Sequence, residues 1–317
     1  MASKWTIASL SAKVVVVTGP TASGKTELLE GVFARGASSF IGGAEVISAD
    51  AMQAYRGMDI GTAKPARELL ERLPHSLIDI KNPDEQYTAG EFVRLADERC
   101  AALSARGIIP VISGGTGFYI RNFVCGAPAA PPSDPETRRQ VARDLAALGP
   151  AALRDELRSA DPGVADRIAE RDLYRLTRAV EILRASGQPP STFAPKTEPR
   201  AAYEFLILGV DRPRDELRSR IRVRVASMFA AGLADEVAAL EAAGYGPECP
   251  GLKAIGYSEF FQLRGAARSE IAAAIELHTA HYAKRQMTFL RALPGIRWIA
   301  PDAEALRAAV FSFLHLS

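Results

Sequence analysis

The sequence has few cysteines and no long apolar run, and both shortages limit what the protein can be. Its three cysteines, Cys100, Cys125 and Cys249, are far apart and show no C-x-x-C spacing. That pattern argues against a disulfide framework or a zinc site and fits a reducing cytosol. No stretch approaches the ~20 apolar residues of a membrane helix, and residues 1–13 lack the apolar segment of a signal peptide. We therefore expect a cytoplasmic protein without membrane or zinc.

An excess of charge of one sign is also missing. Lys and Arg number 39 against 37 Asp and Glu, for a net charge of +2. This total neither demands nor excludes a nucleic-acid partner, because a basic patch can lie within a neutral total. Apolar residues make up 48% of the 317 positions, enough for a large core. The length suits a large α/β domain, alone or with an added subdomain.

Strand-like and helical segments alternate along much of the chain, which predicts an α/β fold with a parallel sheet and helices on both faces. The expected strands are 13–17, 45–50, 77–80, 108–113, 205–210 and 297–299. The expected helices start at about Gly24 and span 88–106, 215–243 and 269–291. Thr88 and Glu91 form a T-x-x-E capping box at the start of the second of these.

The pattern changes in the middle of the chain. Residues 127–135 form a Pro/Ala linker, and 135–187 read as helical, rich in Arg and without a strand-like run. We expect an all-helical domain inserted into the α/β core. The predicted boundaries are 1–121 for the first part of the core, 122–200 for the insertion and 201–317 for the second part.

A phosphate-binding loop follows the first predicted strand. The segment Gly19-Pro20-Thr21-Ala22-Ser23-Gly24-Lys25-Thr26 fits G-x-x-x-x-G-K-[ST] in full. Glycines let successive N–H groups point at phosphate oxygens, Lys25 adds a cation, and the Thr26 hydroxyl can hold Mg²⁺. The alternative is an ordinary Gly-rich turn. The pattern does not separate ATP, GTP and an isoprenoid diphosphate, although the guanine-reading N-K-x-D signature is absent.

Polar residues also follow other predicted strands, where parallel sheets form ligand crevices. Asp50 can bind Mg²⁺, directly or through water, or accept a proton from an attacking amine or hydroxyl, unless it only shapes a turn or caps a helix. Asp79 is a weaker rival, because it is expected within its strand. Gly114-Gly115-Thr116-Gly117 allows close backbone approach and offers the Thr116 hydroxyl, or is a plain turn.

Basic residues four apart share one face of the predicted helix 215–243. These are Arg220 and Arg224, and the alternative to a role in a site is a solvated basic face. His278 and His281 have i,i+3 spacing, but no nearby carboxylate or Cys completes a metal set, so zinc is not expected there.

Several segments resemble the tRNA dimethylallyltransferases in order and spacing. They are GPTASGKT, ISADAMQAYRGMDIGTAKP, PHSLIDI, GGTGFYI, DLYRLTRAVEILRASG, GLKAIGYSEF and AKRQMTFLR, from about Lys13 to Trp298. The resemblance implies a P-loop NTPase-like core with an inserted helical domain. It also implies transfer of a dimethylallyl group from dimethylallyl diphosphate, with Mg²⁺, to the exocyclic amine of the adenosine 3′ of the anticodon, in tRNAs reading U-initial codons. Cysteine spacing for the zinc finger of some eukaryotic members is absent, which indicates the bacterial type.

The resemblance also implies roles for individual residues. The diphosphate loop falls on Gly19–Thr26, the general base on Asp50 and a hydroxyl near the target base on Thr116. Contacts to tRNA fall on Asp50-Ala51-Met52-Gln53, where Ala51 replaces the family's Ser, and on Tyr174-Arg175-Leu176-Thr177-Arg178, where Tyr174 replaces Gln.

The resemblance also implies roles for the cations. Lys25, Arg220 and Arg224 are expected to neutralise the departing diphosphate. Lys284 and Arg285 can contact tRNA phosphates or form a solvated face. Arg175 and Arg178, three apart, suit two RNA phosphates, or instead pair with Asp172 or Glu181.

Other functions remain open at this point. An adenylate isopentenyltransferase shares the P-loop but acts on a free nucleotide, which needs no Arg-rich insertion. A small-molecule P-loop kinase is a second alternative. A non-catalytic nucleic-acid-binding module is a third, and the P-loop, Asp50 and Thr116 argue against it. We expect a monomeric tRNA-modifying enzyme.

Overall fold

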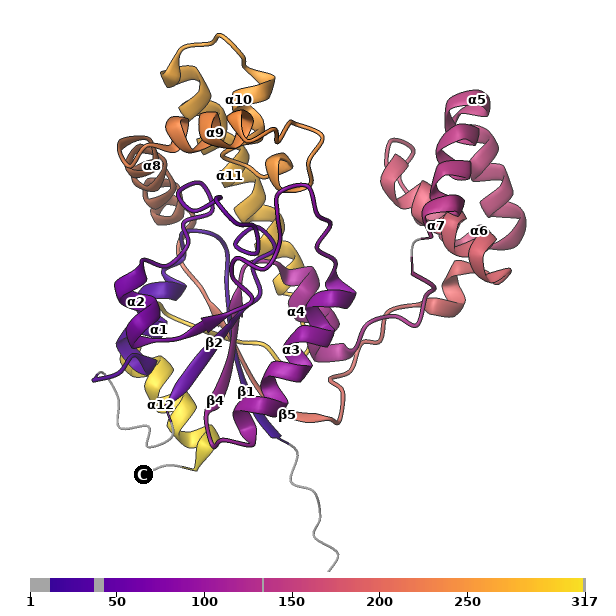
Figure 1. Ribbon diagram of the computed structural model, residues 1–317. Helices are drawn as coiled ribbons and strands as arrows, with labels where there is room; N and C mark the ends of the chain where they lie inside the picture. Colours follow the sequence, from indigo (N-terminus) through magenta and orange to yellow (C-terminus); the bar gives the residue numbers. More distant parts are fainter. Residues whose placement is uncertain (1–11, 37–42, 133, 316–317) are drawn as a thin grey trace, which may run out of the picture. The chain divides into compact units, whose positions relative to one another are not determined.

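The computed structural model describes residues 12–36, 43–132 and 134–315, and its centre is a six-stranded parallel sheet (Figure 1). The strand order is β3-β2-β4-β1-β5-β6, and all neighbours are parallel. The α/β fold with a parallel sheet predicted from the alternation of segments is therefore confirmed. The strands are β1 (Ala12–Thr18), β2 (Ala44–Ser48), β3 (His75–Ser76), β4 (Ile109–Gly114), β5 (Tyr203–Val210) and β6 (Arg297–Ile299).

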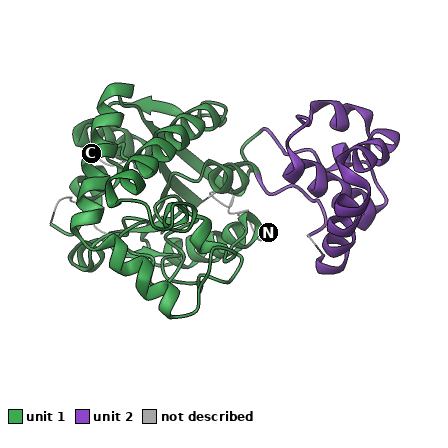
Figure 2. Cartoon of the chain, turned by 90° about the horizontal axis from the view of Figure 1, so that it is seen from above, with its two compact units in different colours: residues 1–125, 198–317 green, residues 126–197 purple. Residues whose placement is uncertain are grey.

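The chain divides into two compact units, coloured separately in Figure 2. Unit 1 comprises residues 1–125 and 198–317 and contains the sheet. Its helices are α1 (Lys25–Phe33), α2 (Arg67–Arg72), α3 (Ala89–Ser104), α4 (Gly117–Cys125), α8 (Arg214–Ala230), α9 (Leu233–Ala242), α10 (Ser258–Gln262), α11 (Arg268–Leu290) and α12 (Ala303–Leu314), with a 3-10 turn η2 (Gly251–Lys253).

Side chains of β1 alternate between two hydrophobic clusters, one on each face of the sheet. Val14 and Val16 pack with residues of α3 and α4. Val15 and Val17 pack with residues of α1 and α12 on the other face. Figure 1 shows α1, α2 and α12 on one side of the strands and α3 and α4 on the other. Because β1 is buried on both faces, its sequence is an uninterrupted apolar run.

Three neighbouring strands end at nearly the same level, and this places the predicted site residues together. β4 lies between β2 and β1, with Ser48 opposite Ser113 and Thr18 opposite Gly114. The phosphate loop follows β1 and the Gly-rich turn follows β4. A side-chain carbon on Gly114 would lie 2.2 Å from Ala49 O, so only glycine lets β2 and β4 approach this closely.

Unit 2, residues 126–197, is helical and has its own core. It contains α5 (Pro135–Ala160), α6 (Pro162–Arg167), α7 (Leu173–Ser186) and the 3-10 turn η1 (Pro190–Phe193). Gly149, with φ 78°, interrupts α5 just before Pro150. The unit is shorter than the predicted insertion 122–200, because α4 continues to Cys125 within unit 1 and the chain re-enters that unit at Glu198.

Two secondary-structure predictions are wrong. Residues 77–80 are not a strand, because Leu77 and Asp79 have left-handed φ values of 63° and 55°. β3 consists only of the two residues before them. The predicted helix 215–243 is two helices, since Gly232 with φ 98° separates α8 from α9. By contrast, Thr88 caps α3 through Glu91 N–H, and α11 spans the predicted 269–291 within one residue at each end.

A methyl group at Gly114 should force β2 and β4 apart. We expect Gly114→Ala to lower the free energy of unfolding by about 1–3 kcal/mol, as overpacking does. The matched control is Gly31→Ala in α1, where the added carbon would meet only Ala303 Cβ at 3.6 Å. It should leave stability unchanged or raise it by up to about 1 kcal/mol, because alanine favours helix. Scanning calorimetry checks both, and equal stability of the two variants would contradict the strand-end constraint.

Candidate active site

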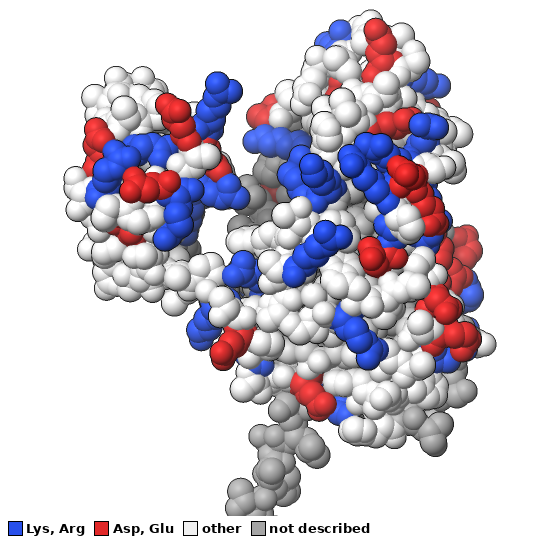
Figure 3. All heavy atoms as spheres, turned by 180° about the vertical axis from the view of Figure 1, so that it is seen from behind, with Lys and Arg blue, Asp and Glu red and all other residues white. Residues whose placement is uncertain are grey.

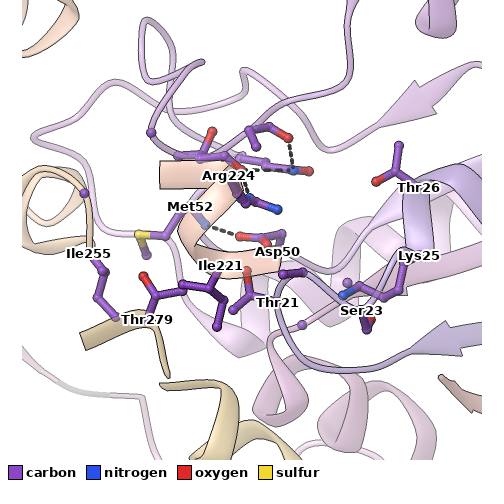
Figure 4. A pocket seen from close by; sticks show the side chains of 18 of the residues that line it. Thr21, Ser23, Lys25, Thr26, Asp50, Met52, Ile221, Arg224, Ile255 and Thr279 are labelled. Carbon is purple, nitrogen blue, oxygen red and sulfur yellow. Dashed lines mark hydrogen bonds between the residues drawn. The ribbon is translucent and has the colours of Figure 1, made fainter. Parts of the chain in front are cut away.

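A cavity of about 930 Å³ lies at the carboxyl edge of the sheet in unit 1. Its lining comes from the phosphate loop, the segment after β2, the segment 61–65 without Lys64, and the segment after η2. Helices α8 and α11 complete it, α11 through Ile275, Thr279, Tyr282 and Gln286. Figure 4 shows Lys25 and Thr26 toward one end, Asp50 centrally, and Met52, Ile255 and Thr279 toward the other. The cavity therefore has a cationic and a more apolar end.

The phosphate loop adopts the tight turn that its glycines predicted. Gly24 has φ 93° and precedes the first residue of α1, so the N-terminus of that helix faces the cavity. Lys25 Nζ donates to Gly19 O and Pro20 O, both at 2.9 Å. Ser23 Oγ is buried and has no hydrogen-bond partner within the described part of the chain. Six of the eight predicted loop residues, Thr21 to Thr26, line the cavity.

Two arginines of α8 lie with Lys25 at this end of the cavity. Arg220 Nε donates to Ala22 O at 2.7 Å, and Arg224 lines the cavity. Burial lowers the pKa of Lys25 to about 8, an effect that Asp50 opposes and Arg224 increases. Burial also lowers the pKa of Arg224. Lys25 and Arg224, two cations held close together and away from water, indicate a site for an anion.

Asp50, the predicted general base, lines the cavity. Its Oδ1 accepts the Met52 N–H at 3.0 Å, and Oδ2 accepts no hydrogen bond from any residue that the structure describes. The free oxygen is thus able to take a proton from a ligand. The rival Asp79 is exposed, pairs with Lys64 and does not line the cavity.

Of the residues after Asp50, some line the cavity and others form hydrogen bonds behind it. Met52 and Gln53 line the cavity, and Gln53 Oε1 accepts from Ser48 Oγ at 3.1 Å. Ala51 does not line it; its N–H donates to Thr116 Oγ at 3.0 Å. Thr116 itself lies behind the lining residues, so the hydroxyl predicted beside the target base holds the backbone next to Asp50 in this structure.

A glutamine on α11 ties the phosphate loop to the Gly-rich turn. Gln286 Oε1 accepts the Thr21 N–H at 2.9 Å, and its Nε2 donates to Gly115 O at 2.8 Å. Tyr282, one turn earlier, lines the cavity; burial raises its pKa to about 12, and the Asp50 charge adds to this. Sequence reasoning missed both and singled out only their neighbours Lys284 and Arg285. The available signal was a glutamine four residues after a tyrosine, on the buried face of a helix.

Arg212 was also missed. Its Nε donates to Ser23 O at 3.0 Å, and its guanidinium ends 3.2 Å from where a side chain on Gly24 would begin. Arg212 therefore stabilises the phosphate loop without lining the cavity. A single Arg before Pro213 carried no signal in the sequence.

The predicted tRNA-binding residues of unit 2 lie on α7 with different exposures. Tyr174 is 82% exposed, and Arg175 is exposed and pairs with Asp172. Leu176 is fully buried in the core of unit 2, so its side chain is structural and the prediction that it contacts tRNA is wrong. Arg178 donates to Glu181 Oε2 at 3.2 Å and to Pro131 O at 2.7 Å. Thr177 Oγ donates to Tyr174 O at 3.1 Å.

Lys284 and Arg285 are exposed on α11 and do not line the cavity. The guanidinium of Arg285 lies over the Tyr282 ring, 5.8 Å from its centre. Figure 3 shows Lys and Arg spread over the visible face of unit 1, several gathered in its upper half, with acidic side chains between them. This face offers positive charge without being uniformly basic.

Within the described residues, no three His, Cys, Asp or Glu side chains are grouped to hold a metal ion. His278 Nδ1 lies 2.6 Å from Oε1 of the buried Glu259, a carboxylate that the sequence did not place near it. No helix in the described part of the chain is long and apolar enough to span a membrane.

Comparisons with known proteins agree with this arrangement. The family model described as IPP transferase matches residues 53–293. The chain is 41% identical to a tRNA dimethylallyltransferase of Anaeromyxobacter dehalogenans over 94% of this chain and 97% of the relative. It is 41% identical to one of Geobacter sulfurreducens over 90% and 91%. The crystal structure of a tRNA isopentenylpyrophosphate transferase from Bacillus halodurans matches with a TM-score of 0.66 and 31% identity, over 96% of each chain. The chain thus belongs to the tRNA dimethylallyltransferases, the IPP transferase family of prenyltransferases.

Proposed function

We propose that this tRNA dimethylallyltransferase binds dimethylallyl diphosphate at the cationic end of its cavity and moves the dimethylallyl group to a tRNA adenosine. The acceptor is the exocyclic amine of the adenosine 3′ of the anticodon, in tRNAs that read U-initial codons. The observation that carries the proposal is the position of Asp50, between Lys25 and Thr26 on one side and Met52 and Ile255 on the other (Figure 4).

The reaction follows from that arrangement. The bond between the allylic carbon and the diphosphate oxygen breaks, and the charge that develops on the diphosphate is stabilised by loop N–H groups, Lys25, Arg220 and Arg224. The exocyclic nitrogen forms the new C–N bond. Its proton passes to Asp50 Oδ2, which has no competing donor among the described residues. Because the target base must leave its stack to reach Asp50, a flipped adenine is expected.

Mg²⁺ fits the cationic end of the cavity. Ser23 Oγ is buried there without a partner in the described chain, and the exposed Thr26 side chain lines the same space. Hydroxyl and carboxylate oxygens are ligands that Mg²⁺ accepts together with phosphate oxygens. Thr26, with Asp50 through a water molecule so that Oδ2 stays free for the proton, would hold the ion. When bound, Mg²⁺ adds positive charge on the diphosphate.

Unit 2 is the proposed tRNA-binding element. Its exposed Tyr174 and Arg175 lie on one segment of α7, and an exposed aromatic ring beside a guanidinium suits RNA bases and phosphates. A free nucleotide, the acceptor of an adenylate isopentenyltransferase, would need no separate helical unit. The relatives named tRNA dimethylallyltransferase match this chain over 94% and 90% of its length.

Transfer to tRNA can be measured directly. Wild-type protein incubated with Mg²⁺, dimethylallyl diphosphate and unmodified tRNA should yield dimethylallyl-adenosine, detected by mass spectrometry of the nucleosides. Asp50→Asn keeps the shape but removes the proton acceptor, so kcat should fall about 10²–10⁴-fold with little change in tRNA affinity. Asp84→Asn, at an exposed carboxylate outside the cavity lining, is the control and should be fully active. Product formation only with AMP, or phosphate transfer from ATP to a small acceptor, would overturn the proposal.

The lowered pKa of Lys25 predicts a pH dependence. Its ammonium is charged below about pH 8 and becomes neutral above it, so the donor site loses positive charge as the pH rises. We expect kcat/KM for the donor, which reports the free enzyme, to fall above about pH 8. Lys25→Arg keeps its charge at all these pH values, so its lower activity should lack that fall. An identical alkaline limb in both proteins would assign it to another group.

The salt dependence of tRNA binding tests unit 2. Arg175→Gln should weaken binding and flatten the log–log salt slope by about 0.7–0.9, one phosphate contact. Adding Arg178→Gln should bring the change to about one to two units. Arg67→Gln, an exposed arginine on α2, is the control for charge alone.

Arg178 also holds Pro131 O and Glu181, so thermal stability is measured beside binding. An unchanged slope with lowered stability would make these arginines structural and move the tRNA surface elsewhere, first to Lys284 and Arg285.

A further inference from the structure

A carboxylate on α9 holds the backbone of a segment that forms one side of the cavity. We call residues 58–65 the wall loop, because four of them, Gly61, Thr62, Ala63 and Pro65, line the cavity. Glu236 Oε2 accepts the N–H groups of Asp59 at 2.9 Å and Ile60 at 2.8 Å. Its Oε1 accepts the Gly61 N–H at 3.2 Å. Three successive backbone N–H groups thus converge on one carboxylate, as in backbone anion-binding nests.

Tyr257 completes this arrangement. Its hydroxyl donates to Glu236 Oε1 at 2.6 Å, so each carboxylate oxygen accepts two hydrogen bonds and the acceptor capacity of the group is filled. Burial raises the pKa of Tyr257, and the hydrogen bond and charge of Glu236 add to this, so the hydroxyl remains a donor. A side-chain carbon on Gly61 would lie 2.4 Å from the Tyr257 ring, so the wall loop packs here only through glycine.

The carbonyl groups of the wall loop face two residues with roles in the proposed reaction. Arg224 donates to Thr62 O at 3.4 Å. Gln53 Nε2 lies 3.5 Å from the same oxygen and 3.3 Å from Ala63 O. Arg224 belongs to the proposed diphosphate side of the site, and Gln53 lies in the segment after Asp50 that the family resemblance assigns to tRNA contact. One short stretch of backbone therefore orients groups for both substrates.

The geometry points to Glu236 as a positioning residue that fixes the wall loop and, through it, Arg224 and Gln53. Glu236 does not line the cavity, so it acts without touching either substrate. This inference rests on the proposed function, since Arg224 and Gln53 matter only if the cavity joins donor and acceptor.

Glu236→Gln is the sharp test, because the amide keeps the shape but presents N–H donors where two hydrogen bonds must be accepted. We expect kcat to fall about 10- to 100-fold, as displacement of positioning groups does, and KM to rise for both dimethylallyl diphosphate and tRNA. Asp235→Asn, the exposed neighbour in the first turn of α9, is the matched control and should behave as wild type. Amide hydrogen exchange should accelerate in peptides covering 58–65 and stay unchanged in β1 and β4.

Tyr257→Phe removes only one donor and should give a smaller effect in the same direction, so the inference stays testable if Glu236→Gln folds poorly. A loss of stability with unchanged KM values per folded enzyme would show a merely structural role and overturn the inference. So would equal kinetics of Glu236→Gln and Asp235→Asn, or unchanged exchange in 58–65. Absence of transfer by the wild-type protein would instead refute the proposed function.

Discussion

The active site depends on how closely the ends of β2 and β4 approach each other. With Ala49 O only 2.2 Å from where a Gly114 side chain would begin, the two strands finish side by side, and β1 finishes level with them. In a parallel sheet each such end releases a loop into the same crevice. The phosphate loop, Asp50 and the Gly-rich turn meet there because three strands end together.

Helices from the second half of the chain then fix these loops. Gln286 uses both ends of one amide to join the phosphate loop to the Gly-rich turn, and Glu236 gathers three N–H groups of the wall loop. Arg212 and Arg220 hold carbonyl groups of the phosphate loop itself. Loop N–H and C=O groups have no partners in a helix or sheet, so side chains supply their hydrogen bonds. These hydrogen bonds fix the conformation of the loops at the cavity.

The charged groups of the site also lie close together. Lys25 and Arg224 both have lowered pKa values because burial disfavours their charged forms. The charge of Arg224 lowers the pKa of Lys25 further, and the charge of Arg220 lowers that of Arg224. Asp50 opposes the shift in both. A bound anion would reduce the repulsion between these cations.

The sequence by itself determined what local patterns encode. Contiguous residues build the phosphate loop, the apolar run of β1 requires a strand buried on both faces, and the alternation of segments requires a parallel sheet. Leu77 and Asp79 could not be predicted, because left-handed backbone at non-glycine residues of an apolar segment has no local signature. The helix break at Gly232 was also missed, although a glycine within a helical pattern is a signal for one. Leu176 sits within a segment that was predicted to bind tRNA, yet its burial depends on the packing of α5 against α7. Only the tertiary structure decided that Gln286 meets Thr21, 265 positions away, and that Glu236 meets the wall loop, because such contacts arise from helix packing on the sheet rather than from any spacing along the chain.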